Sequence, residues 1–104
     1  MAITATNENF AGIIASSKPV VVDFWATWCG PCRVLAPVVE EVGAQYADKA
    51  DIVKCNVDEC EDIAMQYGIR NIPTLLYFKD GKVVDRTVGV VAAEEIVRRI
   101  ESML

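Results

Sequence analysis

Residues 20–26 read VVVDFWA, and this segment limits the possible folds more than any other feature of the chain. The run is almost entirely apolar and rich in β-branched and aromatic residues, which is typical of a strand covered on both faces. Such strands belong to parallel or mixed sheets with helices on either side. Asp23 interrupts the run, so we expect a buried carboxyl group there, and burial raises a carboxyl pKa by disfavouring the charged form.

A long helix is expected soon after this strand. Beyond Cys32 the apolar residues recur with a period of 3.6, which favours a helix packed on the sheet. Pro37 falls inside this helix and lacks a backbone donor, so we expect a kink rather than a break. The apolar stripe expected to face the sheet consists of Val34, Leu35, Val38, Val39, Val42 and Tyr46.

Shorter elements are predicted before and after this pair. Thr6 is expected to cap a short helix that carries Phe10, Ile13 and Ile14 on its apolar face and ends by Pro19. Residues 51–58 predict a second strand, and residues 59–68 predict a short helix closed by Gly68.

The C-terminal part of the chain predicts a hairpin and a last helix. Residues 74–79 and 82–88 are strand-like, and Asp80-Gly81 between them readily supplies the positive φ values of a two-residue turn. The last helix is expected to present one apolar face made of Ile96, Val97, Ile100, Met103 and Leu104.

This order of elements predicts an α/β fold. A βαβ half is followed by a helix, a β-hairpin and a terminal helix. A parallel crossover combined with an antiparallel hairpin gives a mixed central β-sheet with helices on both faces. The 104 residues contain no low-complexity tract, linker or internal repeat. Residues 1–104 are therefore expected to form a single domain.

Composition excludes several kinds of chemistry. The chain has no His, so it can form neither a Ser-His-Asp or Cys-His catalytic unit nor a His-ligated metal site. Its net charge of -5, from 10 Lys and Arg against 15 Asp and Glu, makes a nucleic-acid partner unexpected. The first residues lack a basic segment and no apolar run is long enough to span a bilayer, so a cytoplasmic protein without membrane association is expected. Thiols are kept reduced in that compartment, which favours catalytic or incidental roles for the four Cys.

Cys29-Gly30-Pro31-Cys32 lies between the buried strand and the long helix. A helix N-terminus favours an anion, and a thiolate is an anion. A free Cys of pKa ~8.5 needs a downward shift of ~1.5 units to be half ionised at pH 7. Cys29, first in the pair and expected to face solvent, is interpreted as the nucleophile, and the shielded Cys32 as the resolving thiol. Gly30 allows another chain to approach, and Pro31 fits the first helical position.

The C-x-x-C spacing of Cys29 and Cys32 has two other interpretations. A C-x-x-C can be half of a zinc or iron–sulfur site, for which Cys55 and Cys60 are the remaining candidate ligands. The Pro within the pair, its location at the start of a helix and the irregular second spacing argue against this. A structural disulfide is less expected still in a reducing compartment.

Residues 23–32, which read DFWATWCGPC, resemble the active-site segment of the thioredoxin family. The similarity covers the whole chain and extends through Pro37, Lys54, Ile72-Pro73-Thr74, Gly81 and Gly89. It implies the thioredoxin fold and a redox disulfide between Cys29 and Cys32.

The resemblance also implies roles for residues outside the cysteine pair. In this family the counterpart of Asp23 relays a proton for the inner cysteine, so Asp23 is expected to accept the proton of Cys32. A hydrogen-bonded core Asp without a catalytic role is the alternative. Lys54 is expected to tune Asp23 from the neighbouring strand, or else to be an ordinary surface lysine.

A docking surface for clients is implied around the pair. Pro73 is cis in similar proteins and faces the two cysteines there, although nothing local in this sequence reveals its isomer. The residues implied to dock clients are Trp28, Gly30, Pro31, Ile72, Pro73 and Gly89. Trp25 is interpreted as a packing residue.

Three residues depart from the family pattern. Ala92 stands where many members have a polar N-cap for the last helix, which should cost that helix ~1 kcal/mol. Cys55 is interpreted as a buried apolar cysteine, and Cys60 lies among acidic residues that disfavour a thiolate. A regulatory disulfide between Cys55 and Cys60 is the alternative.

The function predicted is that of a protein-disulfide reductase and electron carrier. A thioredoxin reductase would recycle it, and the flavin and NADPH would be held by that partner, so no cofactor is expected here. Disulfide-containing proteins are the expected clients, and a monomer is the expected state. A binding subunit that uses the same surface without turnover is the second hypothesis. An oxidase or isomerase is disfavoured by the Gly-Pro dipeptide and by the lack of an export signal.

Overall fold

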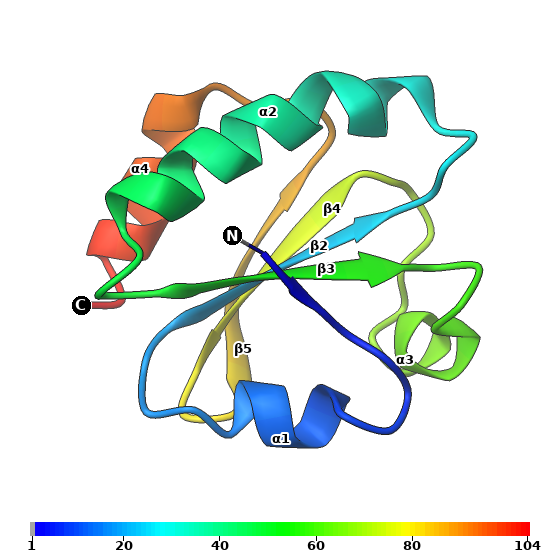
Figure 1. The fold of residues 1–104 in the computed structure, drawn as a ribbon, viewed down its shortest axis with the longest axis horizontal. Helices are drawn as coiled ribbons and strands as arrows, with labels where there is room; N and C mark the ends of the chain where they lie inside the picture. The colour runs from blue at the N-terminus through cyan, green and yellow to red at the C-terminus, as the bar shows by residue number, and fades with distance from the viewer. Residues whose placement is uncertain (1) are drawn as a thin grey trace.

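The computed structural model describes residues 2–104 and arranges them around a single sheet (Figure 1). The strands are β1 (Ile3–Thr4), β2 (Val20–Trp25), β3 (Asp51–Asn56), β4 (Thr74–Lys79) and β5 (Lys82–Val88), and the helices are α1 (Phe10–Ile14), α2 (Gly30–Gln45), α3 (Glu61–Gln66) and α4 (Ala93–Glu101). No helix within this part of the chain combines the length and apolar character needed to cross a membrane.

The sheet is mixed and has the order β1-β3-β2-β4-β5. β2 lies at its centre, parallel to β3 and antiparallel to β4, and β4 and β5 form the antiparallel hairpin. The predicted α/β architecture is therefore confirmed. β1 was not expected, because a strand of two exposed residues leaves no alternating pattern in the sequence.

Helices cover both faces of the sheet (Figure 1). Successive side chains of β2 alternate between the two cores: Val20, Val22 and Phe24 pack with α1 and α3, and Val21 packs with α2 and α4. All four side chains are inaccessible to solvent. Coverage on both faces explains why residues 20–26 are continuously apolar.

Two residues assigned to apolar faces prove to be exposed. Val34 is 60% exposed, because the buried face of α2 is the narrow stripe of Leu35, Val39 and Val42, and Val34 points about 100° away from it. Leu104 is 53% exposed whereas its neighbour Met103 packs into the core: both lie beyond Glu101, where α4 ends, so the helical period no longer determines which of them faces the sheet. The predictions for these two side chains were wrong.

The first helix begins later than expected. Thr6 does not cap α1, which starts at Phe10 with Asn9 in the N-cap position. Thr6 and Asn9 instead close the preceding turn reciprocally: the Asn9 amide donates to Thr6 Oγ1 at 3.1 Å, and the Thr6 amide donates to Asn9 Oδ1 at 2.7 Å. Thr6 therefore does accept a backbone amide, as a capping residue would, but in the turn before α1 rather than at the N-terminus of that helix.

The predicted hairpin turn is confirmed. Asp80 and Gly81 both have positive φ, 53° and 80°, between the paired residues Lys79 and Lys82. Positive φ at both central residues gives the turn the twist that antiparallel strands require.

Candidate active site

The cysteine pair lies where the chain leaves the sheet and enters α2. Cys29 is the N-cap of α2 and Cys32 lies in its first turn, with a disulfide between them and Cα atoms 5.3 Å apart. The Cys32 amide donates a hydrogen bond to Cys29 Sγ at 3.2 Å. When the disulfide is reduced, the same amide and the helix N-terminus face a sulfur that can become a thiolate, which they stabilise.

The residues between the two cysteines leave room for another chain. Gly30 is the first helical residue and Pro31 the second, one position later than expected for the proline. A Cβ built on Gly30 would meet nothing within 4 Å, so the space in front of the pair is open.

Cys29 itself faces solvent less than expected. Only 5% of Cys29 and 3% of Cys32 are exposed in the disulfide form. Ile72 and Trp25 pack against the pair, and the Ile72 carbonyl oxygen lies 3.8 Å from Cys29 Sγ. The expectation of a solvent-facing Cys29 was wrong, because a loop distant in sequence covers its sulfur.

That loop contains a cis peptide bond between Ile72 and Pro73, just before β4 begins at Thr74. The Pro73 carbonyl accepts a hydrogen bond of 2.8 Å from the amide of Gly89, whose φ of 84° suits glycine. Ile72, Pro73 and Gly89 thus form one group beside the disulfide. Pro73 is itself buried and Ile72 is half-buried.

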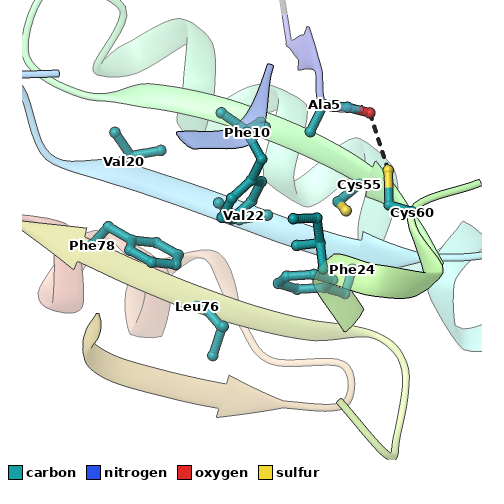
Figure 2. Close-up of a cluster of buried hydrophobic side chains, with 11 residues drawn as sticks. Ala5, Phe10, Val20, Val22, Phe24, Cys55, Cys60, Leu76 and Phe78 are labelled. Carbon is teal, nitrogen blue, oxygen red and sulfur yellow. Dashed lines mark hydrogen bonds between the residues drawn. The ribbon is translucent and has the colours of Figure 1, made fainter. Parts of the chain in front are cut away.

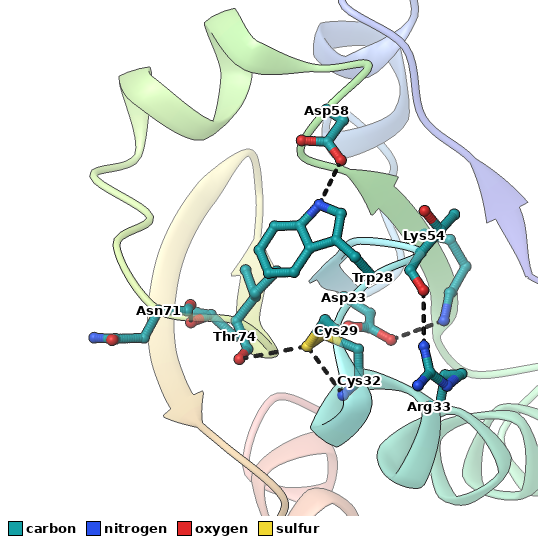
Figure 3. The surroundings of a disulfide bond; sticks show 11 residues. Asp23, Trp28, Cys29, Cys32, Arg33, Lys54, Asp58, Asn71 and Thr74 are labelled. Carbon is teal, nitrogen blue, oxygen red and sulfur yellow. Dashed lines mark hydrogen bonds and ion pairs between the residues drawn. A yellow bond between two sulfur atoms is a disulfide. The ribbon is translucent and has the colours of Figure 1, made fainter.

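Trp28 is an exposed member of the predicted docking surface. Its side chain is 66% exposed, and its Nε1 donates to Asp58 Oδ2 at 2.8 Å (Figure 3). Asp58 belongs to the turn between β3 and α3, where its amide donates to Asn56 Oδ1. Sequence reasoning missed Asp58, because nothing local links residues 30 positions apart.

Asp23 is buried, as its sequence context predicted, with 1% of the residue exposed. Its Oδ2 accepts a hydrogen bond from Lys54 Nζ at 3.0 Å, since Asp23 and Lys54 are register partners on β2 and β3. Burial raises the pKa of Asp23, and the charge and hydrogen bond of Lys54 offset part of that rise. Oδ1 is buried and has no hydrogen-bond partner among residues 2–104.

A cavity of about 300 Å³ lies between Lys54 and the inner cysteine. Cys32, Trp25 and Lys54 line it, together with Arg33 and Glu40 from α2. Lys54 Nζ also lies 5.1 Å from the centre of the Trp25 ring.

The other two cysteines lie apart from the disulfide. Cys55 on β3 and Cys60 at the start of α3 are free thiols, buried in the core beneath α1 and α3. Within residues 2–104, no group of three or more His, Cys, Asp or Glu could hold a metal ion.

Comparison with the sequences of known proteins points to one family. The family model described as Thioredoxin matches residues 1–102. Thioredoxin 1 of Synechococcus elongatus is 52% identical over 105 residues, covering 100% of this chain and 98% of its own. A thioredoxin of Chlorobaculum thiosulfatiphilum is 53% identical, covering 93% of this chain and 91% of its own. One from Alicyclobacillus acidocaldarius is 45% identical, with 98% and 97% covered.

Proposed function

The chain belongs to the thioredoxin family and is a thiol–disulfide oxidoreductase that acts on disulfide-containing proteins, and we propose that Cys29 and Cys32 carry this activity in two steps. In the first, the Cys29 thiolate attacks one sulfur of a client disulfide, forms a mixed disulfide and releases a client thiolate. In the second, Cys32 attacks Cys29 Sγ, which releases the second client thiol. The product is the Cys29–Cys32 disulfide.

The observation that carries this proposal is the location of the disulfide at the N-terminus of α2. Cys29 in the N-cap position accepts the Cys32 amide, an arrangement that lowers a thiol pKa and stabilises the reduced form of the outer cysteine as a thiolate. Cys32 is almost completely buried and is proposed to react with a client already bound to Cys29.

Asp23 is proposed to accept the proton that Cys32 loses in the second step. Its raised pKa lets it exchange a proton closer to neutral pH than an ordinary carboxyl group does. The cavity lined by Cys32 and Lys54 offers the path, and Lys54 tunes Asp23 through its ion pair.

Clients are proposed to dock on the surface around Cys29. Trp28 and Pro31 are exposed there, and Gly30, Ile72 and Gly89 are partly so. Pro73 is proposed to act by presenting the Ile72 backbone, since the proline is itself buried. A client strand laid against this backbone would bring its disulfide to Cys29.

We propose further that a thioredoxin reductase returns the disulfide to the dithiol, and that the protein works as a monomeric electron carrier in the cytoplasm. Recycling by a reductase is supported by membership of the thioredoxin family. The single domain expected from the sequence, residues 1–104, suffices for this role because both cysteines and every docking residue lie at the N-terminus of α2 or in the loops that precede α2 and β4 and follow β5.

Reduction of insulin disulfides by dithiothreitol tests the proposal. Wild-type protein should accelerate insulin precipitation, and Cys29→Ser should abolish the acceleration. Cys32→Ser should stop turnover and trap a mixed disulfide through Cys29. Cys60→Ala is the matched cysteine control and should keep the activity. Full activity in Cys29→Ser would overturn the proposal and favour a binding role for this surface.

A further inference from the structure

Cys55 and Cys60 form a second pair of thiols that the proposed reaction does not use. Both are almost completely buried, 0% and 1% exposed, and both belong to the core cluster under α1 and α3. Figure 2 shows their side chains next to each other at one end of this cluster. Packing alone does not require cysteine at either position, because another small apolar residue would fill the same space.

The turn between β3 and α3 brings the two cysteines together. The Asn56 carbonyl, directly after Cys55, accepts the Cys60 amide at 2.9 Å and the Glu59 amide at 2.9 Å. The Cys60 thiol is close enough to raise the pKa of Cys55 by hydrogen bonding and charge, in addition to the larger effect of burial. Neighbouring thiols on a fixed turn need little motion to join.

A backbone segment from the other end of the chain covers this pair. Cys60 Sγ donates to the Ala5 carbonyl at 3.2 Å (Figure 2). Ala5 follows β1, a strand of two exposed residues at the edge of the sheet. Ala5 is itself buried and its amide donates to the Lys54 carbonyl at 2.9 Å, so this cover opens only when the N-terminal segment leaves the edge of the sheet. Short edge strands open more readily than central ones.

Asn9 holds the cover in place from the neighbouring turn. Its Oδ1 accepts the Thr6 amide at 2.7 Å, and its Nδ2 donates to the Thr4 carbonyl at 3.1 Å. These two bonds lie on either side of Ala5. Asn9 itself is exposed and makes no part of the core.

We propose that Cys55 and Cys60 are a second redox-active dithiol, which a small two-electron oxidant such as hydrogen peroxide converts to an intramolecular disulfide when the N-terminal segment opens. Cys60 reacts first, because lifting Ala5 exposes its sulfur. One oxygen of the peroxide is transferred to the sulfur to give a sulfenic acid, and the other oxygen leaves as water. The Cys55 sulfur then attacks Cys60 Sγ, and the hydroxyl leaves as a second water with the Cys55 proton. Two thiols are oxidised and one peroxide is reduced.

The resulting disulfide would brace the turn that holds Trp28. Asp58, which accepts the Trp28 indole, lies between the two cysteines in the chain. Oxidation of the second pair can therefore alter the docking surface through Asp58 and Trp28, without any change at Cys29 or Cys32.

The test is the mass and thiol content of protein treated with hydrogen peroxide. A Cys29→Ser/Cys32→Ser variant retains only this pair, so after treatment and unfolding we expect no reactive thiol, a monomeric mass lighter by two hydrogen atoms, and a single peptide linking Cys55 to Cys60. Adding Cys60→Ala should prevent the mass loss. Two free thiols after treatment, sulfinic or sulfonic acids, or disulfide-linked dimers would each overturn the proposal.

The cover is tested separately in the same background. Asn9→Ala removes both bonds that flank Ala5 and should accelerate formation of the disulfide several-fold. Asn7→Ala, an exposed asparagine in the same turn, is the matched control and should leave the rate unchanged. Equal rates in the Asn9→Ala and Asn7→Ala proteins would show that opening of this segment does not control the reaction.

Discussion

Asp23 combines a structural cost with a proposed catalytic use. It is a buried carboxyl group with one oxygen bound to Lys54 and the other without a partner among residues 2–104. Burial opposes ionisation, and an incompletely satisfied buried charge destabilises the fold. The rise in its pKa makes Asp23 a stronger base than an ordinary carboxylate, which suits the proposed role of proton acceptor.

Because the buried charge of Asp23 destabilises the fold, Asp23→Asn should stabilise the protein by an amount that depends on pH. Below the ordinary value of 3.8 the carboxyl is protonated in both the folded and the unfolded protein. As pH rises from there to the raised pKa, only the unfolded form ionises, so the folded protein holds more protons and the stability of the wild type falls. The melting temperature of Asp23→Asn relative to wild type should therefore increase across this window and then level off. Thermal unfolding in a pH series measures this, and a constant or shrinking difference would contradict it.

The proposed use of Asp23 predicts a pH-dependent loss of activity in Asp23→Ala. Insulin reduction should fall by roughly tenfold or more near neutral pH, because Cys32 has no acceptor for its proton. The loss should shrink toward about pH 9, where solvent can remove the proton of a thiol with an ordinary pKa. Wild-type rates from about pH 6 to 9 would exclude the relay.

Asp58 predicts an effect on docking rather than on chemistry. Asp58→Ala removes the acceptor of the exposed Trp28 indole, and such a bond contributes about 0.5–1.5 kcal/mol. We expect KM for a protein client to rise by roughly two- to tenfold at unchanged kcat. Glu59→Ala, the neighbouring exposed acid, is the control and should behave as wild type. A fall in kcat alone would mean that Asp58 acts on the cysteines instead.

The helices differ in how their first turns are stabilised. α2 begins at a cysteine whose sulfur accepts a backbone amide, so its cap is also the proposed reactive group. The N-cap of α4 is Ala92, as expected, which makes no side-chain hydrogen bond to the helix, although Glu94 and Glu95 in the first turn interact favourably with the helix dipole. The missing cap therefore belongs to a helix that carries neither cysteine.

Ala92→Asp should stabilise the protein by supplying that cap. Aspartate at the N-cap accepts an amide of the first turn, and the gain relative to alanine is ~1 kcal/mol. Urea unfolding should show a higher midpoint with the same slope, and insulin reduction should be unchanged. Ala47→Asp, in an exposed turn, is the control. An equal shift in both variants would mean that added charge, not capping, is responsible.

At the scale of the elements, the sequence predicted those strands, helices and turns that have a clear local sequence pattern. The central strand, the long helix and the Asp80-Gly81 hairpin follow from local patterns and are confirmed. β1 and the start of α1 do not follow, because two residues carry no period and the Thr6 cap serves a turn instead. Val34 was misplaced because apolar residues adjacent to a buried stripe need not belong to it.

At the scale of the whole molecule, the site depends on contacts that no local pattern records. The position of Cys29 and Cys32 was predictable, since a strand followed by a helix places them at the helix N-terminus. Their cover was not, because the cis bond at Pro73 and the Ile72 carbonyl come from a loop 43 residues away. The cavity behind Cys32 likewise forms only when β2, β3 and α2 pack together.

The reduction potential of the Cys29/Cys32 pair tests the central claim most directly. Equilibration with known ratios of reduced and oxidised dithiothreitol, acid quenching and alkylation give the fraction of each form, and peptide mapping separates this pair from Cys55 and Cys60. A disulfide reductase should be more reducing than glutaredoxins, with a potential below about −230 mV. A value at or above about −180 mV, the range of protein disulfide isomerases, would contradict a reducing role for this protein.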